Sequence, residues 1–347
     1  MWLSMLKVIT IIGFMIFAIC VAGGVGVEGT LGFKYWSDPG PFQPYIVDGA
    51  VGKFVGFWAV LIQASFAYQG AELVGVGAGE ARNPGKTVPR AIRTTFWGVM
   101  FLFVVSIFLI GMVVPSNDQG LLTEASNASA SPLVIAAKRA GVKVLPDIIN
   151  AVLLTAVLSA ANSNVYSGSR ILVALADEGQ APAFFKKTDK NGIPIVSVAV
   201  TSAFGLLGFL NLSSSGAQVF NWFLNISGVA GLICWACTCA AYLGFRRALT
   251  AQGMSRDDLP YKSPLQPYTA MYGLFFNVLI ALTQGFTVFM EWDVSGFFAA
   301  YVSLMLFAAL WVVHKVVTLS KLPDPRDADL VRGRIAPENP PTERLED

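Results

Sequence analysis

Charged residues are scarce in this chain, and no polar stretch is long enough to form a catalytic domain. Only 13% of the 347 residues are Asp, Glu, Lys or Arg, whereas 54% are hydrophobic and the mean hydropathy is +0.60. That balance excludes an ordinary soluble globular protein. No nucleophile–base pair, phosphate-binding loop or metal-ligand set has catalytic spacing, and a net charge of +2 indicates no nucleic-acid partner. We therefore do not expect an enzyme.

Potential metal ligands are few as well. The four cysteines all fall in apolar runs, at Cys20, Cys234, Cys237 and Cys239. The last three share one hydrophobic segment with no second ligand cluster, which favours buried thiols over a metal site. The single histidine, His314, ends the last apolar run and is more typical of an interface residue than of a ligand. We expect neither a metal nor a cofactor.

Long apolar runs are abundant, and they predict an all-α membrane protein with about eight transmembrane helices. Residues 1–319 would form the membrane domain, and residues 320–347 a polar, proline-punctuated cytoplasmic tail without fixed structure. A further segment, Ser131–Leu145, has the pattern of a short amphipathic surface helix. The predicted spans are Trp2–Val21, Phe54–Gly79, Thr94–Val114, Asp147–Val173, Ile193–Leu212, Val219–Phe245, Met271–Met290 and Gly296–Val317.

Basic residues alternate between the loops and so predict the orientation. They gather after the second, fourth and sixth spans and in the tail, while the opposite loops carry few. The loop after the third span is an exception, with Lys138, Arg139 and Lys143. Because cytoplasmic loops are enriched in Lys and Arg, this pattern places both termini in the cytoplasm.

The most unusual segment runs from Phe54 to Glu80. Glu72 is the first charge after Phe54 and lies beside Gly70, with further glycines following. A carboxylate in lipid costs about 2.5 kcal/mol or more, and glycine weakens a helix. One interpretation is a spanning helix that opens near Tyr68–Ala71, as discontinuous helices do in many transporters. The alternative is a continuous helix whose small residues pack closely against neighbours.

Three other spans carry polar residues that lipid should exclude. Lys7 in the first span is either a snorkelling cation near the interface or a buried one that takes part in proton coupling. The polar groups of the fourth and sixth spans could serve a ligand or only interhelical hydrogen bonds and packing. These groups are Asn162, Ser163, Asn164 and Ser167 in the fourth span, and Trp222, Asn225, Ser227 and Gly228 in the sixth.

Together these patches suit a zwitterionic cargo. Such a molecule needs acceptors for its ammonium and donors for its carboxylate, and exposed carbonyls and helix N-termini supply both without full charges in lipid. A lining of many neutral dipoles and few charges also allows the cargo to be released.

Several segments resemble one family in order and spacing, essentially from Met1 into the tail. They are MLKVITIIGF, SFAYQGAELVGVGAGEARNPGKTVPRAI, VLSAANSNVYSGSRILVALADEGQAPAFF, FNWFLNISGVAGLICW and FRRALTAQGMSRDDLPYKSPLQPY. The chain is similar to the fungal amino-acid permeases of the amino acid–polyamine–organocation superfamily. The resemblance implies a proton-coupled importer of amino acids in the plasma membrane, with a five-plus-five inverted-repeat fold.

The resemblance also implies roles for particular residues. Lys7 matches a lysine implicated in proton coupling, and Phe66–Glu72 matches an unwound stretch whose backbone holds the substrate amine. The remaining implied substrate contacts lie in two later spans, at Asn162, Ser163, Trp222, Asn225 and Ser227. The full set from the unwound stretch is Phe66, Ala67, Tyr68, Gln69, Gly70, Ala71 and Glu72.

This chain departs from the family pattern at its start, which matches the family's fifth span. The fold is therefore expected to be partial, lacking the first four spans, and the product alone is expected not to transport. The rival expectation within the same family is an amino-acid sensor that carries little cargo. Neither the amino acids carried nor the oligomeric state follows from the sequence.

Overall fold

A computed structural model describes residues 2–77, 84–122, 131–212, 216–259, 261–319 and 324–330, and these residues form helices and loops without a strand. The principal helices are α1 (Trp2–Ala22), α3 (Gly49–Ala59), α4 (Leu61–Tyr68), α6 (Pro84–Val113), α8 (Pro132–Arg139), α9 (Leu145–Asp177), α10 (Ile195–Ala203), α11 (Gly216–Ala251), α12 (Tyr268–Thr283) and α13 (Val294–Thr318). Short helices lie between them: α2 (Lys34–Ser37), α5 (Leu73–Val76), α7 (Gln119–Leu122), and the 3-10 segments η3 (Ala183–Lys186), η4 (Phe204–Leu212), η5 (Arg256–Asp258) and η6 (Phe286–Phe289).

Within the described residues, seven helices or helix sets are long and apolar enough to cross a membrane. The predicted all-α membrane fold is thereby confirmed. The remaining predicted span, Ile193–Leu212, is α10 continued by η4, each of nine residues. At about 1.5 Å per residue in an α-helix and 2.0 Å in a 3-10 helix, the pair extends about 31 Å. This segment is therefore also long enough for the hydrocarbon core of a bilayer.

Many large apolar side chains of these helices are exposed, as expected for helices in lipid. Phe101 on α6 is 63% exposed and Val316 on α13 is 68% exposed. A soluble protein would lose stability by leaving so many large apolar groups in water. The exposed faces therefore agree with a bilayer as the solvent.

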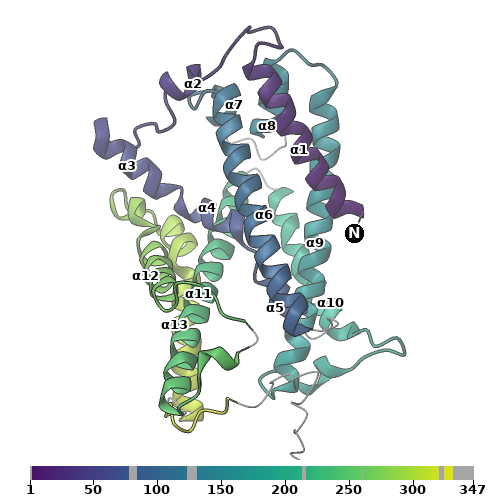
Figure 1. Ribbon diagram of the computed structural model, residues 1–347, viewed down its shortest axis with the longest axis vertical. Coiled ribbons are helices and arrows are strands. Elements are labelled where there is room, and N and C mark those ends of the chain that lie inside the picture. The colour runs from purple at the N-terminus through teal and green to yellow at the C-terminus, as the bar shows by residue number, and fades with distance from the viewer. Residues whose placement is uncertain are drawn as a thin grey trace, which may run out of the picture. The chain divides into compact units, whose positions relative to one another are not determined.

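The chain divides into two compact units. Unit 1 comprises residues 1–61, 70–77 and 92–224, and unit 2 comprises residues 62–69, 78–91 and 225–347. In unit 1, α1 lies beside α9, and α9 also packs against α8 and α10 (Figure 1). The largest core of unit 1 joins α1, α6 and α8 through residues such as Ala18, Val113 and Ala136.

Unit 2 contains α4, the part of α11 from Asn225 onward, α12 and α13 (Figure 1). Its core consists of Ile62 from α4, Val229 and Leu232 from α11, and Ala281 from α12. Leu304 of α13 packs against this group. Of the predicted tail, residues 324–330 are described, and the side-chain amide of Gln252 donates hydrogen bonds to Pro325 O and Ala328 O. Residues 320–323 and 331–347 lie outside the described residues.

Helix α8 differs from the amphipathic surface helix predicted at Ser131–Leu145. The helix ends at Arg139, and its residues from Val134 to Ala137 are all buried in unit 1. The burial of this basic helix is possible because the charge of Arg139 is paired with carboxylates. Its guanidinium lies 2.9 Å from a Glu28 carboxylate oxygen and 2.7 Å from one of Asp118, so the charge is compensated inside the fold.

Tyr35 of α2 completes this group in unit 1. Its hydroxyl donates to Glu28 at 2.8 Å and accepts from Arg139 at 2.9 Å. Burial, followed by the hydrogen bond to Glu28, raises the pKa of Tyr35 above its ordinary value. Burial opposes the charge on Arg139, but hydrogen bonds to Asp118 and Tyr35 raise its pKa overall. Arg139, one of the basic residues that depart from the alternation of loop charges, thus forms two ion pairs within unit 1.

Candidate functional site

The segment from Phe54 to Glu80 is interrupted beside Glu72, at the place given by the first of its two interpretations. Helix α4 ends at Tyr68, and the four-residue helix α5 begins at Leu73. Gly70 between them has a φ of +103°, which residues with a side chain rarely adopt. Hydrogen bonds of the turn run from Gln69 N to Phe66 O and from Leu73 N to Gly70 O, a three-residue spacing. The regular four-residue hydrogen bonds of an α-helix are therefore broken at this point.

A second interruption, which the sequence analysis missed, separates α3 from α4. Helix α3 ends at Ala59, and Val60 has φ −91° and ψ 0°. Val60 is an ordinary apolar residue in an apolar run, so nothing in its type indicates a break. Residues 78–83, including Gly79 and Glu80 of the predicted segment, lie outside the described residues.

Glu72 turns its carboxylate back onto the interruption. Both of its carboxylate oxygens accept hydrogen bonds from the backbone N–H of Gly70, at 3.1 Å each. The carboxylate thus occupies the backbone N–H of Gly70. The last carbonyl groups of α4 have no partner within the helix, so the groups that stay available at the interruption are mainly hydrogen-bond acceptors. An arrangement rich in acceptors is suited to a cation such as an ammonium group.

Gln69 is committed to unit 2 rather than free for a ligand. Its side-chain amide donates to Ser227 O and Gly228 O of α11, at 3.1 Å each. Two glycines make room for α4 here. A Cβ on Gly228 would lie 3.0 Å from the side chain of Ile62, and a Cβ on Gly231 would lie 1.9 Å from the Nε2 of Gln69. The structure thus brings together two of the predicted site residues, Gln69 and Ser227, by a structural contact.

Gly231 is a packing position that the sequence did not single out. The available signal was its spacing, three residues after Gly228 on the same helix face. Small residues at such spacing allow close approach of membrane helices, but the sequence does not say which helix approaches.

Asn162 and Ser163 lie on exposed positions of α9 in unit 1. The hydroxyl of Ser163 donates to Ser159 O, and that of Ser167 donates to Ser163 O. Both hydroxyl groups therefore donate their hydrogen bonds to carbonyl groups of α9 itself. Helix α5, directly after the interruption, packs against α9 in the same unit.

The remaining predicted site residues are distributed over α11 and α1. Trp222 and Asn225 are half-buried in α11, and Ser227 is exposed. Lys7 is half-buried in the second turn of α1, and its ammonium makes no hydrogen bond or ion pair within the described part of the chain. Its position near the helix start fits both the snorkelling and the proton-coupling interpretation.

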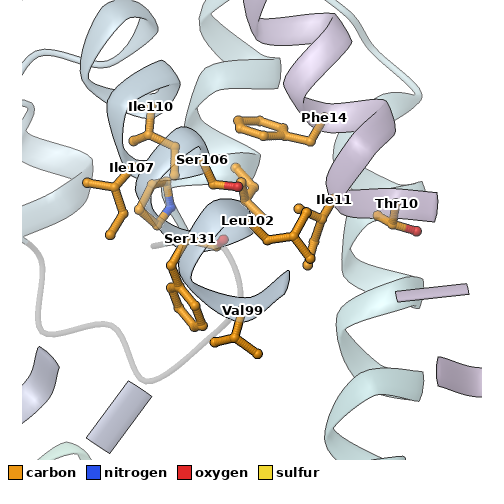
Figure 2. Close-up of a pocket in the computed structure, with 12 residues that line it drawn as sticks. Thr10, Ile11, Phe14, Val99, Leu102, Ser106, Ile107, Ile110 and Ser131 are labelled. Atoms are coloured by element: carbon orange, nitrogen blue, oxygen red, sulfur yellow. The ribbon is translucent and has the colours of Figure 1, made fainter. Parts of the chain in front are cut away.

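Unit 1 also contains an apolar cleft of about 460 Å³ between α1, α6 and the start of α8. Ile11 and Phe14 line one side and Leu102 and Ile110 the other (Figure 2). The side chain of Thr10 is occupied by a hydrogen bond to Leu6 O. Ser106 and Ser131 contribute the other hydroxyl groups of the lining, which has no charged or amide side chain. The cleft therefore offers no charged partner to either end of an amino acid.

Comparison with known proteins gives the family. A model of the amino acid permease family matches residues 1–324. The chain belongs to that family. It is similar to a basic amino-acid permease of Saccharomyces cerevisiae, 45% identical over 318 residues, which cover 90% of this chain and 56% of the relative. A lysine-specific permease of the same yeast is 45% identical over 313 residues, covering 90% and 51%.

A proline-specific permease of Emericella nidulans is also similar, with 42% identity over 323 residues that cover 91% of this chain and 58% of the relative. The chain thus spans about half the length of the curated relatives it matches. These relatives are named as permeases, which are transporters and not enzymes.

Proposed function

We propose that this permease-family chain takes part in amino-acid transport across a membrane, with the interruption between α4 and α5 as the place where the substrate ammonium binds. The observation that carries the proposal is the left-handed backbone at Gly70, which ends α4 in the middle of an apolar segment. Carbonyl groups freed at that end, together with the Glu72 carboxylate, would replace the water around an ammonium group. Relatives named for basic amino acids, lysine and proline support amino acids as the substrate class.

The proposal extends to direction and energy source. Proton-coupled import across the plasma membrane, with both termini in the cytoplasm, agrees with the loop charges and with the resemblance. Lys7 is the proposed coupling residue. Phe66, Ala67, Tyr68, Ala71, Asn162, Ser163, Trp222 and Asn225 remain predicted substrate contacts. Gln69 and Ser227 differ from them because the hydrogen bond between the two residues needs no ligand.

A hybrid permease tests the proposal. Residues 1–324 would replace the matching region of the yeast basic amino-acid permease, and uptake of labelled lysine, arginine and proline would be measured in cells lacking their own permeases. We expect uptake by the hybrid and its loss on Gly70→Val or Glu72→Gln, with both variants still at the membrane. Gly98→Val is the matched control, because a Cβ at Gly98 meets no atom within 4 Å. Normal uptake by both test variants would contradict the proposed binding place.

A further inference from the structure

A second site lies in unit 2, at the end of α11 farthest from Gly216. A cleft of about 520 Å³ opens there, at the level where α12 begins. Its polar lining comes from Arg246, Arg247 and Thr250 of α11, and Leu243, Met271 and Pro325 are among its other walls. Two cationic side chains in one cleft beside the end of a membrane helix favour an anion.

The surroundings of Arg246 strengthen the case for an anion in this cleft. Its Nη1 atom is shielded from solvent and has no hydrogen-bond partner within the described residues. A buried donor on a charged group is costly when it lacks an acceptor. Thr250 does not supply one, since its hydroxyl donates to Arg246 O at 3.1 Å. The side chains of Arg246 and Arg247 line the cleft, and arginine is suited to a phosphate because the phosphate oxygens accept two parallel N–H bonds.

The tail forms part of the cleft through Pro325. Gln252 fixes the turn at 324–330 through Pro325 O and Ala328 O, and so places Pro325 in the wall. The carboxylate of Asp324 accepts a hydrogen bond from the backbone N–H of Arg326 at 2.9 Å, within its own turn.

An apolar groove continues from the cleft. It has a volume of about 470 Å³, is lined by α12 residues including Leu274, Val278 and Leu282, and shares Met271 with the cleft. At 1.5 Å per residue, the distance from Met271 to Leu282 along the helix is about 16 Å. That is about half of the 30 Å hydrocarbon thickness of a bilayer, which is the depth reached by the acyl chains of one leaflet.

We propose that the cleft and the groove together bind one anionic phospholipid. Its phosphate lies at Arg246 and Arg247, and one acyl chain lies along α12 from Met271 to Leu282. The lipid comes from the leaflet that meets this end of α11, where anionic headgroups would be attracted by basic residues close to the helix end. The site is separate from the interrupted helix, and the inference does not depend on the proposed transport function.

Lipid retention by the purified 347-residue chain tests the headgroup. The chain in neutral detergent would be titrated with phosphatidylserine, or with phosphatidylcholine of the same acyl chains, and bound lipid counted by native mass spectrometry. We expect preferential binding of phosphatidylserine, weakened about tenfold in the double variant Arg246→Gln, Arg247→Gln, as the loss of a charge-assisted contact predicts. The matched control is Arg90→Gln with Arg93→Gln, which removes two exposed arginines of α6 and should change binding less than twofold.

Arg247→Gln alone gives the same test if the double variant does not fold, because Arg247 is an exposed residue. Unchanged phosphatidylserine binding by a folded Arg246 or Arg247 variant overturns the proposal, and so does equal binding of both lipids by the original chain.

A groove-filling variant tests the acyl chain. Val278→Trp places a large ring in the groove and should lower phosphatidylserine binding severalfold, whereas Val312→Trp on an exposed face of α13 should not. Excess inorganic phosphate distinguishes a lipid from a soluble anion. Phosphate that fails to displace the lipid supports the proposal, and phosphate that displaces it fully shows a soluble-anion site and overturns it.

Discussion

Gln69 and Gly231 fit together because only a residue without a side chain leaves space for the glutamine amide on α11. The Nε2 of Gln69 would lie 1.9 Å from a Cβ at position 231, far inside contact distance. The same nitrogen donates to two carbonyls of that helix. The last residue before the interruption is therefore fixed to unit 2 by both shape and hydrogen bonds.

Gly231→Ala should lower the unfolding temperature of the purified chain, because the added methyl group displaces the Gln69 amide from its two acceptors. Overpacking of this kind costs about 1–3 kcal/mol. The double variant Gly231→Ala, Gln69→Ala should recover part of the loss, since the shortened side chain no longer clashes. Thermal unfolding followed by tryptophan fluorescence measures both. Equal destabilisation by the single and double variants would mean that the two residues are not coupled.

Gly70→Ala should destabilise the chain by about 1–2 kcal/mol, the cost of a left-handed backbone for a residue with a Cβ. The nearest atom to the added methyl group would be Leu73 Cδ1 at 4.0 Å, so the expected loss comes from the backbone and not from crowding. Gly98→Ala provides the control. It lies inside α6 in open space and should be neutral or slightly stabilising, because alanine favours a helix. Identical melting curves for the two variants would argue against an interrupted helix at Gly70.

Arg139→Met should destabilise unit 1 by about 1–3 kcal/mol, because Glu28, Asp118 and Tyr35 lose a shared partner. Lys138→Met removes the same charge from the neighbouring exposed position of α8 and should have little effect. Comparison of the two melting temperatures separates the ion pairs from net charge. Equal melting temperatures for the two variants would show that the ion pairs of Arg139 do not account for the burial of α8.

The contribution of Tyr35 to stability should depend on pH in the alkaline range. Its folded pKa is raised above the ordinary value of 10.0, first by burial and then by the hydrogen bond to Glu28. A raised pKa means that the stabilisation is complete below the unfolded pKa and is lost as the pH rises through the folded pKa. The difference in melting temperature between the original chain and Tyr35→Phe should therefore be constant at neutral pH and decrease above pH 10. A difference that grows with pH would contradict the shift.

Lys7→Met in the hybrid permease should weaken the dependence of uptake on the proton gradient, whereas Lys7→Arg, which keeps the charge, should preserve more of it. Uptake of labelled substrate would be recorded at several external pH values for each variant. An unchanged pH profile in Lys7→Met would reject a coupling role and favour a snorkelling cation at the helix end.

The interruption at Gly70 could be predicted because its causes are local. A carboxylate, a glycine and an apolar run of spanning length conflict within about one helical turn, and an open helix resolves the conflict wherever the neighbours lie. The membrane fold was predictable for the same reason, since spanning length is a property of each apolar run by itself.

The partners of these segments could not be predicted. The residues next to Gln69 in the sequence do not indicate that its amide contacts α11 near Gly231. The basic residues of α8 indicated a surface helix, because the sequence does not show that Glu28 and Asp118 lie beside Arg139. The break at Val60 likewise has no local cause. The sequence by itself determined which segments enter the membrane and where one of them opens, because hydropathy and backbone preference act within a few residues. The tertiary structure decided which charges and carbonyls meet, because those contacts join residues that lie far apart in the chain.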